Sequence, residues 1–273
     1  MATKTGTRKM PDGTELFTKV WEHPDPDATI LLIHGVSEHT GRWDHVAEIL
    51  VDEGFEVHSY DQRAHGKSGD GVLDIEDFDS YVTDIAHTVD EIRQADRPLI
   101  IYGHSMGGLL STLYAQSEHE QPDLLVLSAP ALSAKASAPA PLRLAAKLLS
   151  KVLPRFAIAS PVDGESLSRD PEVGDAYMND PLVYLKGTSR FGQQLFDAME
   201  RGGANIHLIR VPTLVVHGAD DPTVPPEVSA PLAAIDGVER RVFPGLRHEM
   251  HNEPEQKEIL GFVSRWLKER LSR

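Results

Sequence analysis

The pattern with the clearest chemical meaning surrounds Ser105. Residues 103–107 read Gly-His-Ser-Met-Gly, and they separate an apolar run typical of a strand from a segment with helical spacing. A strand, a sharp turn and a helix give the Gly-x-Ser-x-Gly motif its meaning, because the turn leaves the serine hydroxyl projecting above the sheet. The two glycines relieve the crowding of so tight a turn. We therefore predict that Ser105 is a nucleophile.

A serine nucleophile needs a base within hydrogen-bond reach and a carboxylate that orients this base. Two segments downstream of Ser105 offer these groups, and each directly follows a predicted strand. The first contains Asp220 and Asp221, and the second contains His248 and His251. His248 is favoured as the base because it comes directly after its strand. Spacing alone leaves the choice between Asp220 and Asp221 open.

The order Ser, Asp, His along the chain is that of the α/β-hydrolase fold, and it differs from the order in the chymotrypsin and subtilisin folds. The tetrahedral intermediate also needs two N–H donors aimed at its oxyanion. We expect one from the backbone amide of Met106, at the start of a helix whose dipole favours negative charge. The other is expected from a loop after an early strand, where the Val36 amide is the candidate. Dehalogenases and epoxide hydrolases are excluded, since they need an aspartate at position 105.

The elements that must position these residues alternate along the chain. Short runs rich in leucine and β-branched residues recur between longer segments with helical spacing, which is typical of a mostly parallel sheet with helices on both faces. Strands are predicted at residues 28–33, 56–60, 98–102, 124–128, 213–217 and 240–243. Helices are predicted at residues 43–53, 78–95, 106–116 and 255–271.

Residues 131–210 interrupt this alternation. A crossover between parallel strands usually needs about one or two dozen residues, whereas about eighty separate two strong strands here. We predict that residues 131–210 form an inserted helical cap, or lid, with helices at residues 171–178 and 189–201 among others. Residues 1–130 and 211–273 then form the α/β-hydrolase core.

Composition excludes several classes of function. The 273 residues carry 42 acidic and 27 basic side chains, a formal net charge of -15 at pH 7, and no cysteine. Such a charge argues against a nucleic-acid partner and against adsorption of the whole surface to an anionic membrane. The lack of cysteine excludes disulfides, thiolate metal sites and a cysteine nucleophile.

The charge is not evenly spread. Residues 131–210 hold ten Lys and Arg against eight Asp and Glu. Four basic residues recur at every fourth position along one predicted helix: Arg143, Lys147, Lys151 and Arg155. This spacing predicts either a solvated helix face or an interfacial helix that makes transient contact with anionic lipid through the cap.

No stretch approaches the roughly eighteen apolar residues that a membrane span needs, and no apolar region of a secretory signal follows the polar first residues. We expect a cytoplasmic protein, at most peripheral at a membrane. The sequence does not indicate an oligomeric state.

With these residues assembled, the chain resembles the monoacylglycerol lipase family of serine α/β-hydrolases, and most of all its bacterial members. The similar stretches lie at residues 34–43, 61–68, 103–108, 180–183 and 248–253, so the resemblance covers nearly the whole chain. At two positions in this chain, Ser37 and Ala64, the family commonly has glycine. A Cβ there restricts the backbone conformations that glycine permits.

The resemblance implies a role for each candidate residue. The family places its catalytic acid at the fourth residue of a Gly-x-x-Asp-x-x-x-Pro stretch, which is Asp221 in this chain. The resemblance also supports His248 as the base and the amides of Val36 and Met106 as the oxyanion hole. It further implies that three residues lie near the glycerol portion of a substrate: Arg42, His104 and Tyr177.

The reaction that the resemblance implies is hydrolysis of a monoacylglycerol ester to a fatty acid and glycerol through an acyl-enzyme, with no metal and no organic cofactor. Two alternatives stay open. One is a broader carboxylesterase or lysophospholipase that uses the same triad. The other is a hydrolase-fold protein that binds a lipid or a signal without turning it over.

Overall fold

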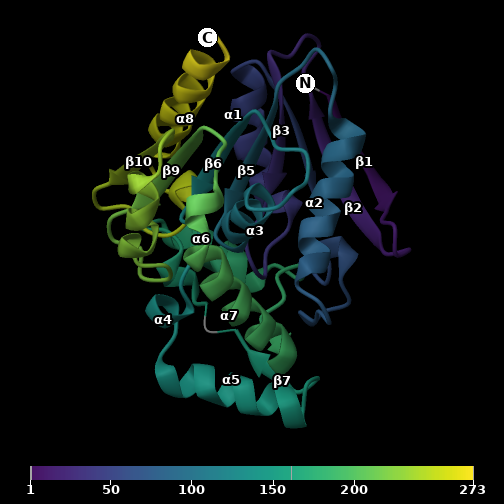
Figure 1. The fold of residues 1–273 in the computed structure, drawn as a ribbon, viewed down its shortest axis with the longest axis vertical. Coiled ribbons are helices and arrows are strands. Elements are labelled where there is room, and N and C mark those ends of the chain that lie inside the picture. Colours follow the sequence, from purple (N-terminus) through teal and green to yellow (C-terminus); the bar gives the residue numbers. More distant parts are fainter. Residues whose placement is uncertain (1, 161, 273) are drawn as a thin grey trace.

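A single mixed sheet organises the protein. The computed structural model describes residues 2–160 and 162–272. Within them, an eight-stranded sheet has the order β1-β2-β4-β3-β5-β6-β9-β10 (Figure 1). The strands are β1 (Ala2–Lys9), β2 (Glu15–Glu22), β3 (Ala28–Ile33), β4 (Phe55–Tyr60), β5 (Leu99–His104), β6 (Leu124–Ser128), β9 (Thr213–Gly218) and β10 (Val238–Phe243). The neighbours from β4 to β10 run parallel, and β2 is antiparallel to both β1 and β4.

Helices cover both faces of the sheet. Because side chains alternate along a strand, Leu31 and Ile33 of β3 point to one face, while Ile30 and Leu32 point to the other. The first face packs against α2 (Asp79–Ile92) and α3 (Met106–Ala115). The second packs against α1 (Asp44–Asp52) and α8 (Gln256–Leu271). The predicted architecture, a mostly parallel sheet with helices on both faces, is confirmed.

The predicted strands and helices match the structure closely. Each of the six predicted strands is present, with ends within two residues of those expected. The structure adds β1 and β2, a hairpin at the sheet edge that hydrophobic patterning does not indicate. The side chains of β1 are almost all exposed, so this strand has no buried face and its sequence shows no apolar alternation.

The segment between β6 and β9 is mostly helical. It contains α4 (Ala134–Ser137), α5 (Ala140–Val152), β7 (Ala157–Ala159), α6 (Pro171–Asn179), β8 (Lys186–Thr188) and α7 (Ser189–Ala204). Helix α7 joins the main core through Phe191, Ala198 and Met199. Helix α5 packs on α7 and buries only Ala146. It lies at one end of the long axis of the molecule, and both chain termini lie toward the other end (Figure 1).

Within residues 2–160 and 162–272, no helix combines the length and the apolar character that crossing a membrane requires.

Candidate active site

Ser105 lies in a strained turn between β5 and α3. Its backbone has φ 53° and ψ −115°, a region that residues with a Cβ rarely adopt. The flanking glycines make the turn possible because other backbone passes very close. A Cβ on Gly107 would lie 2.1 Å from the carbonyl oxygen of Ile33, and one on Gly103 would lie 2.3 Å from the carbonyl oxygen of Gly107. The glycines are therefore required by close packing as well as by the turn.

The structure brings Ser105, His248 and Asp221 together. His248 Nε2 lies 2.9 Å from Ser105 Oγ, and His248 Nδ1 lies 2.7 Å from Asp221 Oδ2. With its proton on Nδ1, the imidazole donates to the carboxylate and accepts from the hydroxyl. His251, the other candidate base, instead stacks on Trp43, with ring centroids 3.9 Å apart. The arrangement is that of a nucleophile, a base and an orienting acid.

The two neighbouring aspartates differ in environment. Asp221 is buried, and its Oδ1 accepts the backbone N–H groups of Thr223 and Val224, each at 2.9 Å. Asp220 is exposed. Burial by itself raises the pKa of Asp221, but the charge of His248 and several hydrogen bonds outweigh it, so the pKa lies below its ordinary value. Burial opposes protonation of His248, yet Asp221 raises the pKa of that imidazole above its ordinary 6.5.

The amides expected to form the oxyanion hole lie on either side of this cluster. Met106 is the first residue of α3, where helical N–H groups have no partner within the helix. Val36 follows β3, and among residues 2–160 and 162–272 neither amide has a protein acceptor. Ser37 and Ala64 adopt φ 66° and 59°. The chain therefore keeps a glycine-like backbone at both positions despite their side chains.

A small cavity of about 20 Å³ lies beside Ser105. Of the three residues predicted near glycerol, His104 and Tyr177 line it and Arg42 does not. Its lining consists of Gly35, Val36, Glu38, His104, Ser105, Val162, Leu167, Tyr177, Thr223, His248 and Glu249. This volume is about that of a single water molecule, so the cavity is too small for an acyl chain in this conformation.

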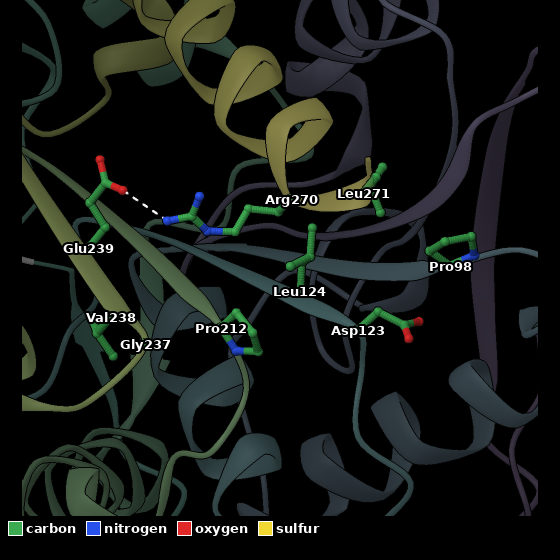
Figure 2. A pocket seen from close by; sticks show the side chains of 9 residues that line it. All are labelled: Pro98, Asp123, Leu124, Pro212, Gly237, Val238, Glu239, Arg270 and Leu271. Carbon is green, nitrogen blue, oxygen red and sulfur yellow. Dashed lines mark hydrogen bonds and ion pairs between the residues drawn. The ribbon is translucent and has the colours of Figure 1, made fainter. Parts of the chain in front are cut away.

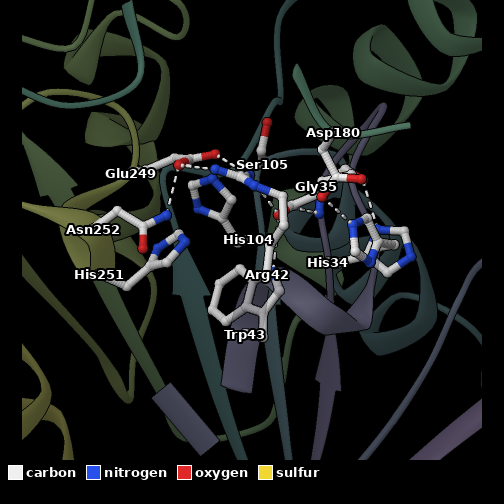
Figure 3. A network of polar contacts seen from close by, with 12 residues as sticks. His34, Gly35, Arg42, Trp43, His104, Ser105, Asp180, Glu249, His251 and Asn252 are labelled. Carbon is white, nitrogen blue, oxygen red and sulfur yellow. Dashed lines mark hydrogen bonds and ion pairs between the residues drawn. The ribbon is translucent and has the colours of Figure 1, made fainter. Parts of the chain in front are cut away.

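Sequence reasoning assigned no role to the two glutamates of this cavity. The Arg42 guanidinium lies between Glu38 and Glu249 and 4.7 Å from the centre of the Tyr177 ring. Figure 3 shows its contact with Glu249. Two signals could have revealed the group. Glu38 and Arg42 have the i,i+4 spacing of a helical ion pair, and Glu249 is the residue after the predicted base.

One buried cluster has the composition of a metal site. His104, Glu249 and His251 place ligand atoms within 4.8 Å of one another. Both carboxylate oxygens of Glu249 already accept from Arg42, and a metal would lie close to that guanidinium charge. We assign no metal to this cluster.

A larger groove lies elsewhere on the molecule. It measures about 760 Å³ and lies where several strands begin, as Figure 2 shows for Leu124, Pro212 and Val238. Ser105 instead follows the carboxyl end of β5, the edge at which parallel sheets place their ligands. The groove at the opposite edge is therefore separate from the candidate active site.

Comparison with known proteins agrees with this geometry. A family model described as serine aminopeptidase, S33, matches residues 24–255. A monoacylglycerol lipase of Mycolicibacterium smegmatis is 35% identical over 266 residues, which cover 93% of each chain. This chain belongs to the monoacylglycerol lipase family of serine α/β-hydrolases. The family resemblance predicted from its motifs is confirmed, and with it the expectation that the protein is a hydrolase.

A further relative and a solved structure are also similar to this chain. Phospholipase YtpA of Bacillus subtilis is 28% identical over 246 residues, covering 88% of this chain and 94% of its own. The crystal structure of a monoacylglycerol lipase from Paleococcus ferrophilus superimposes with a TM-score of 0.85 at 28% identity, over 93% of this chain and 99% of that one. The monoacylglycerol lipase fold therefore extends over nearly the whole chain.

Proposed function

We propose that this protein hydrolyses the ester bond of monoacylglycerols, releasing a fatty acid and glycerol. The observation that carries the proposal is the continuous hydrogen-bonded path from Ser105 Oγ through His248 to Asp221, at 2.9 and 2.7 Å. The relatives from Mycolicibacterium smegmatis and Paleococcus ferrophilus, both named monoacylglycerol lipases, support this choice of substrate.

The chemistry follows from the positions of the three side chains. Ser105 Oγ attacks the ester carbonyl while His248 Nε2 takes the hydroxyl proton, and Asp221 stabilises the imidazolium that forms. The amides of Val36 and Met106 donate to the oxyanion of the tetrahedral intermediate. His248 then gives its proton to the glycerol oxygen as the ester bond breaks. A water molecule gives a proton to His248 and attacks the acyl-enzyme carbonyl. The bond from the acyl group to Ser105 Oγ then breaks, His248 returns the proton to Oγ, and the fatty acid leaves.

Access to Ser105 requires movement in the segment between β6 and β9. Val162, Leu167 and Tyr177 of this segment line the small cavity beside the nucleophile, which is too small for an acyl chain. We propose that residues 131–210 act as the cap of the site, and that their displacement opens a channel for the acyl chain. His104 and Tyr177 then face the glycerol portion, while a contact of Arg42 with glycerol stays a prediction.

A substrate panel tests the proposal. Monoacyl-, diacyl- and triacylglycerols of several chain lengths should be compared with lysophospholipids and short soluble esters. We expect kcat/KM to be highest for a monoacylglycerol, and Ser105→Ala should lose about four orders of magnitude in turnover by analogy with other triads. Wild-type turnover by Ser105→Ala would contradict the assignment of the nucleophile.

A second candidate is a phospholipase or lysophospholipase with the same triad, which the similarity to the Bacillus subtilis enzyme supports. The same substrate panel distinguishes the two candidates, because a lysophospholipase would give its highest kcat/KM with a lysophospholipid. A protein that only binds lipid would hydrolyse none of the substrates. It would also fail to bind a fluorophosphonate covalently, whereas an activated Ser105 reacts with this probe.

We further propose that α5 makes transient contact with anionic membranes. Four large apolar residues are 54–77% exposed on α5 and just after it: Leu144, Leu148, Val152 and Phe156. Lys147 and Lys151 are exposed beside them. An apolar stripe next to basic side chains suits a helix lying in the plane of a lipid interface. The expected cytoplasmic location stays a prediction.

Vesicle binding tests this contact. The double variant Lys147→Glu, Lys151→Glu should bind phosphatidylglycerol vesicles more weakly, because each basic residue near an anionic surface contributes about 1 kcal/mol. Binding to neutral phosphatidylcholine vesicles provides the control. Unchanged sedimentation with the anionic vesicles would contradict a docking role for α5.

A further inference from the structure

A buried arginine joins the loop after β3 to the turn after β10. Arg42 Nη1 donates to Glu38 Oε2 at 3.0 Å and to Glu249 Oε1 at 2.7 Å, and Nη2 donates to Glu249 Oε2 at 2.8 Å. The Arg42 side chain is 10% exposed and each glutamate 3%. Figure 3 shows Arg42 reaching from the first loop to Glu249. Since a planar guanidinium binds a carboxylate in a fixed fork, the two loops hold each other in register.

Glu38 holds the loop that carries the Val36 amide. Its Oε1 accepts the Gly35 N–H at 2.5 Å, and its Oε2 accepts the indole N–H of Trp43 at 2.9 Å. Burial raises the pKa of Glu38, but three N–H donors converge on its oxygens and suit the carboxylate form. Holding the Gly35 N–H restrains the backbone one residue before Val36, whose own N–H is the proposed oxyanion donor.

Glu249 holds the turn that carries His248. It is the next residue in the chain, and its backbone N–H donates to the carbonyl of Leu167 at 2.8 Å. Its Oε2 accepts from Asn252 Nδ2 at 2.7 Å as well as from Arg42. Burial alone raises the pKa of Glu249, but the adjacent Arg42 outweighs this and holds it below its ordinary value. The carboxylate therefore stays charged and paired.

We infer that Arg42, Glu38 and Glu249 are positioning residues that set the Val36 oxyanion donor relative to His248 Nε2. They act through the two loops and transfer no proton in the reaction. The inference rests on the proposed function, because it assumes that Ser105, His248 and the Val36 amide carry out ester hydrolysis. It gives Arg42 a role other than glycerol contact.

The same groups set the charge around His248. Glu249 and Glu38 both favour the imidazolium, in addition to Asp221. His104 packs against His248, with ring centroids 4.8 Å apart. The titratable and charged groups that surround the imidazole are Asp221, His217, His104, Glu38, Arg42, Glu249 and His251. Removal of the charge of Glu249 should therefore lower the pKa of His248.

Steady-state kinetics of two variants test the inference, with a p-nitrophenyl ester and a monoacylglycerol as substrates. Glu249→Gln removes a charge and half of the fork, and Arg42→Lys keeps the charge but removes the fork. A displacement of catalytic groups by about 1 Å can lower the reaction rate by up to about a hundredfold. We therefore expect kcat to fall about ten- to a hundredfold in both variants, while KM stays within about twofold of the wild-type value. In Glu249→Gln, the acidic limb of the kcat/KM profile should also move to lower pH.

A matched control separates positioning from general stability. Arg63 makes a similar fork with the buried Asp84 but contacts neither Gly35 nor His248. Asp84→Asn should lower the melting temperature and leave kcat and the pH profile unchanged. Wild-type kcat and pH profile in Glu249→Gln would overturn the inference. If that variant does not fold, wild-type kcat in Arg42→Lys overturns it and a reduced kcat supports it.

Ser105→Ala in the same assays distinguishes a failure of the proposed ester hydrolysis from a failure of the positioning role. Retained hydrolysis by Ser105→Ala would contradict the proposed function itself. Loss of activity in Ser105→Ala, together with wild-type kinetics in both fork variants, would contradict only the positioning role.

Discussion

The side chains of the two loops around the candidate site and those of helix α5 lie in opposite environments. The loops, residues 34–43 and 245–253, bury charged groups such as Glu38 and Glu253 and pair each with several donors. Helix α5 buries one alanine and leaves leucines and lysines exposed together. Buried charges without partners cost several kcal/mol, so the loops tolerate little change. An exposed apolar stripe costs little in water and is available for contact with another surface.

The largest expected effect is at Asp221, which follows β9 and pairs with His248 of the second loop. Asp221→Asn should lower kcat by about four orders of magnitude, because an amide in this position favours the wrong imidazole tautomer. The exposed neighbour provides the control, and Asp220→Asn should keep kcat within about twofold. Both variants should be measured with the same soluble ester. An equal loss of kcat in both would contradict different roles for the buried and the exposed carboxylate.

Two glycines extend the comparison to helices that pack against these regions. Gly107 of α3 lies against His34 of the first loop, and Gly192 lies in α7, on which α5 packs. In Gly107→Ala the new Cβ would lie 2.1 Å from the carbonyl oxygen of Ile33, and we expect a loss of about 3 kcal/mol in the free energy of unfolding. Gly192 in α7 has no atom within 4 Å of such a Cβ. Gly192→Ala should therefore stabilise the protein by up to about 1 kcal/mol. Denaturant unfolding measures both, and a stable Gly107→Ala would contradict the close packing of the turn.

The pH dependence of activity depends on the protonation of His248. The pKa of His248 is raised above 6.5, mainly because Asp221 favours the imidazolium against the effect of burial. A base must be unprotonated, so kcat/KM should fall about tenfold for each pH unit below that pKa. The midpoint of the acidic limb is expected above pH 6.5. A midpoint well below 6 in the wild-type enzyme would contradict the raised pKa.

The smallest expected effect on stability is in α5. Leu148→Ser and Val152→Ser change side chains that are 57% and 77% exposed, so each should alter the free energy of unfolding by no more than about 0.5 kcal/mol. Both should nevertheless weaken binding to phosphatidylglycerol vesicles. Thermal unfolding and vesicle sedimentation measure the two effects. A large loss in the free energy of unfolding would mean that α5 belongs to the core, as the buried loops do.

Much of the fold and site could be predicted because the relevant signals are local. Continuous apolar runs such as residues 30–33 and 99–102 identified central strands, and glycines on both sides of Ser105 identified the turn. The hairpin of β1 and β2 was missed because β1 is exposed along almost its whole length and β2 buries Leu16 on one face of the sheet and Trp21 on the other, so neither strand shows an apolar alternation. The role of Glu38 and Glu249 was missed because the partner that pairs them, Arg42, lies 207 residues from one of them.

The amino-acid sequence by itself determined the order of strands and helices, the turn at Ser105 and the family of the chain, because these depend on periodicity and short motifs. Spacing left two aspartates open and the family motif favoured Asp221, but only the tertiary structure showed this carboxylate buried against His248 and the His251 ring stacked on Trp43. It also decided that Arg42 faces two glutamates while α5 stays uncovered. These features depend on burial and on contacts between distant segments, and spacing along the chain carries neither.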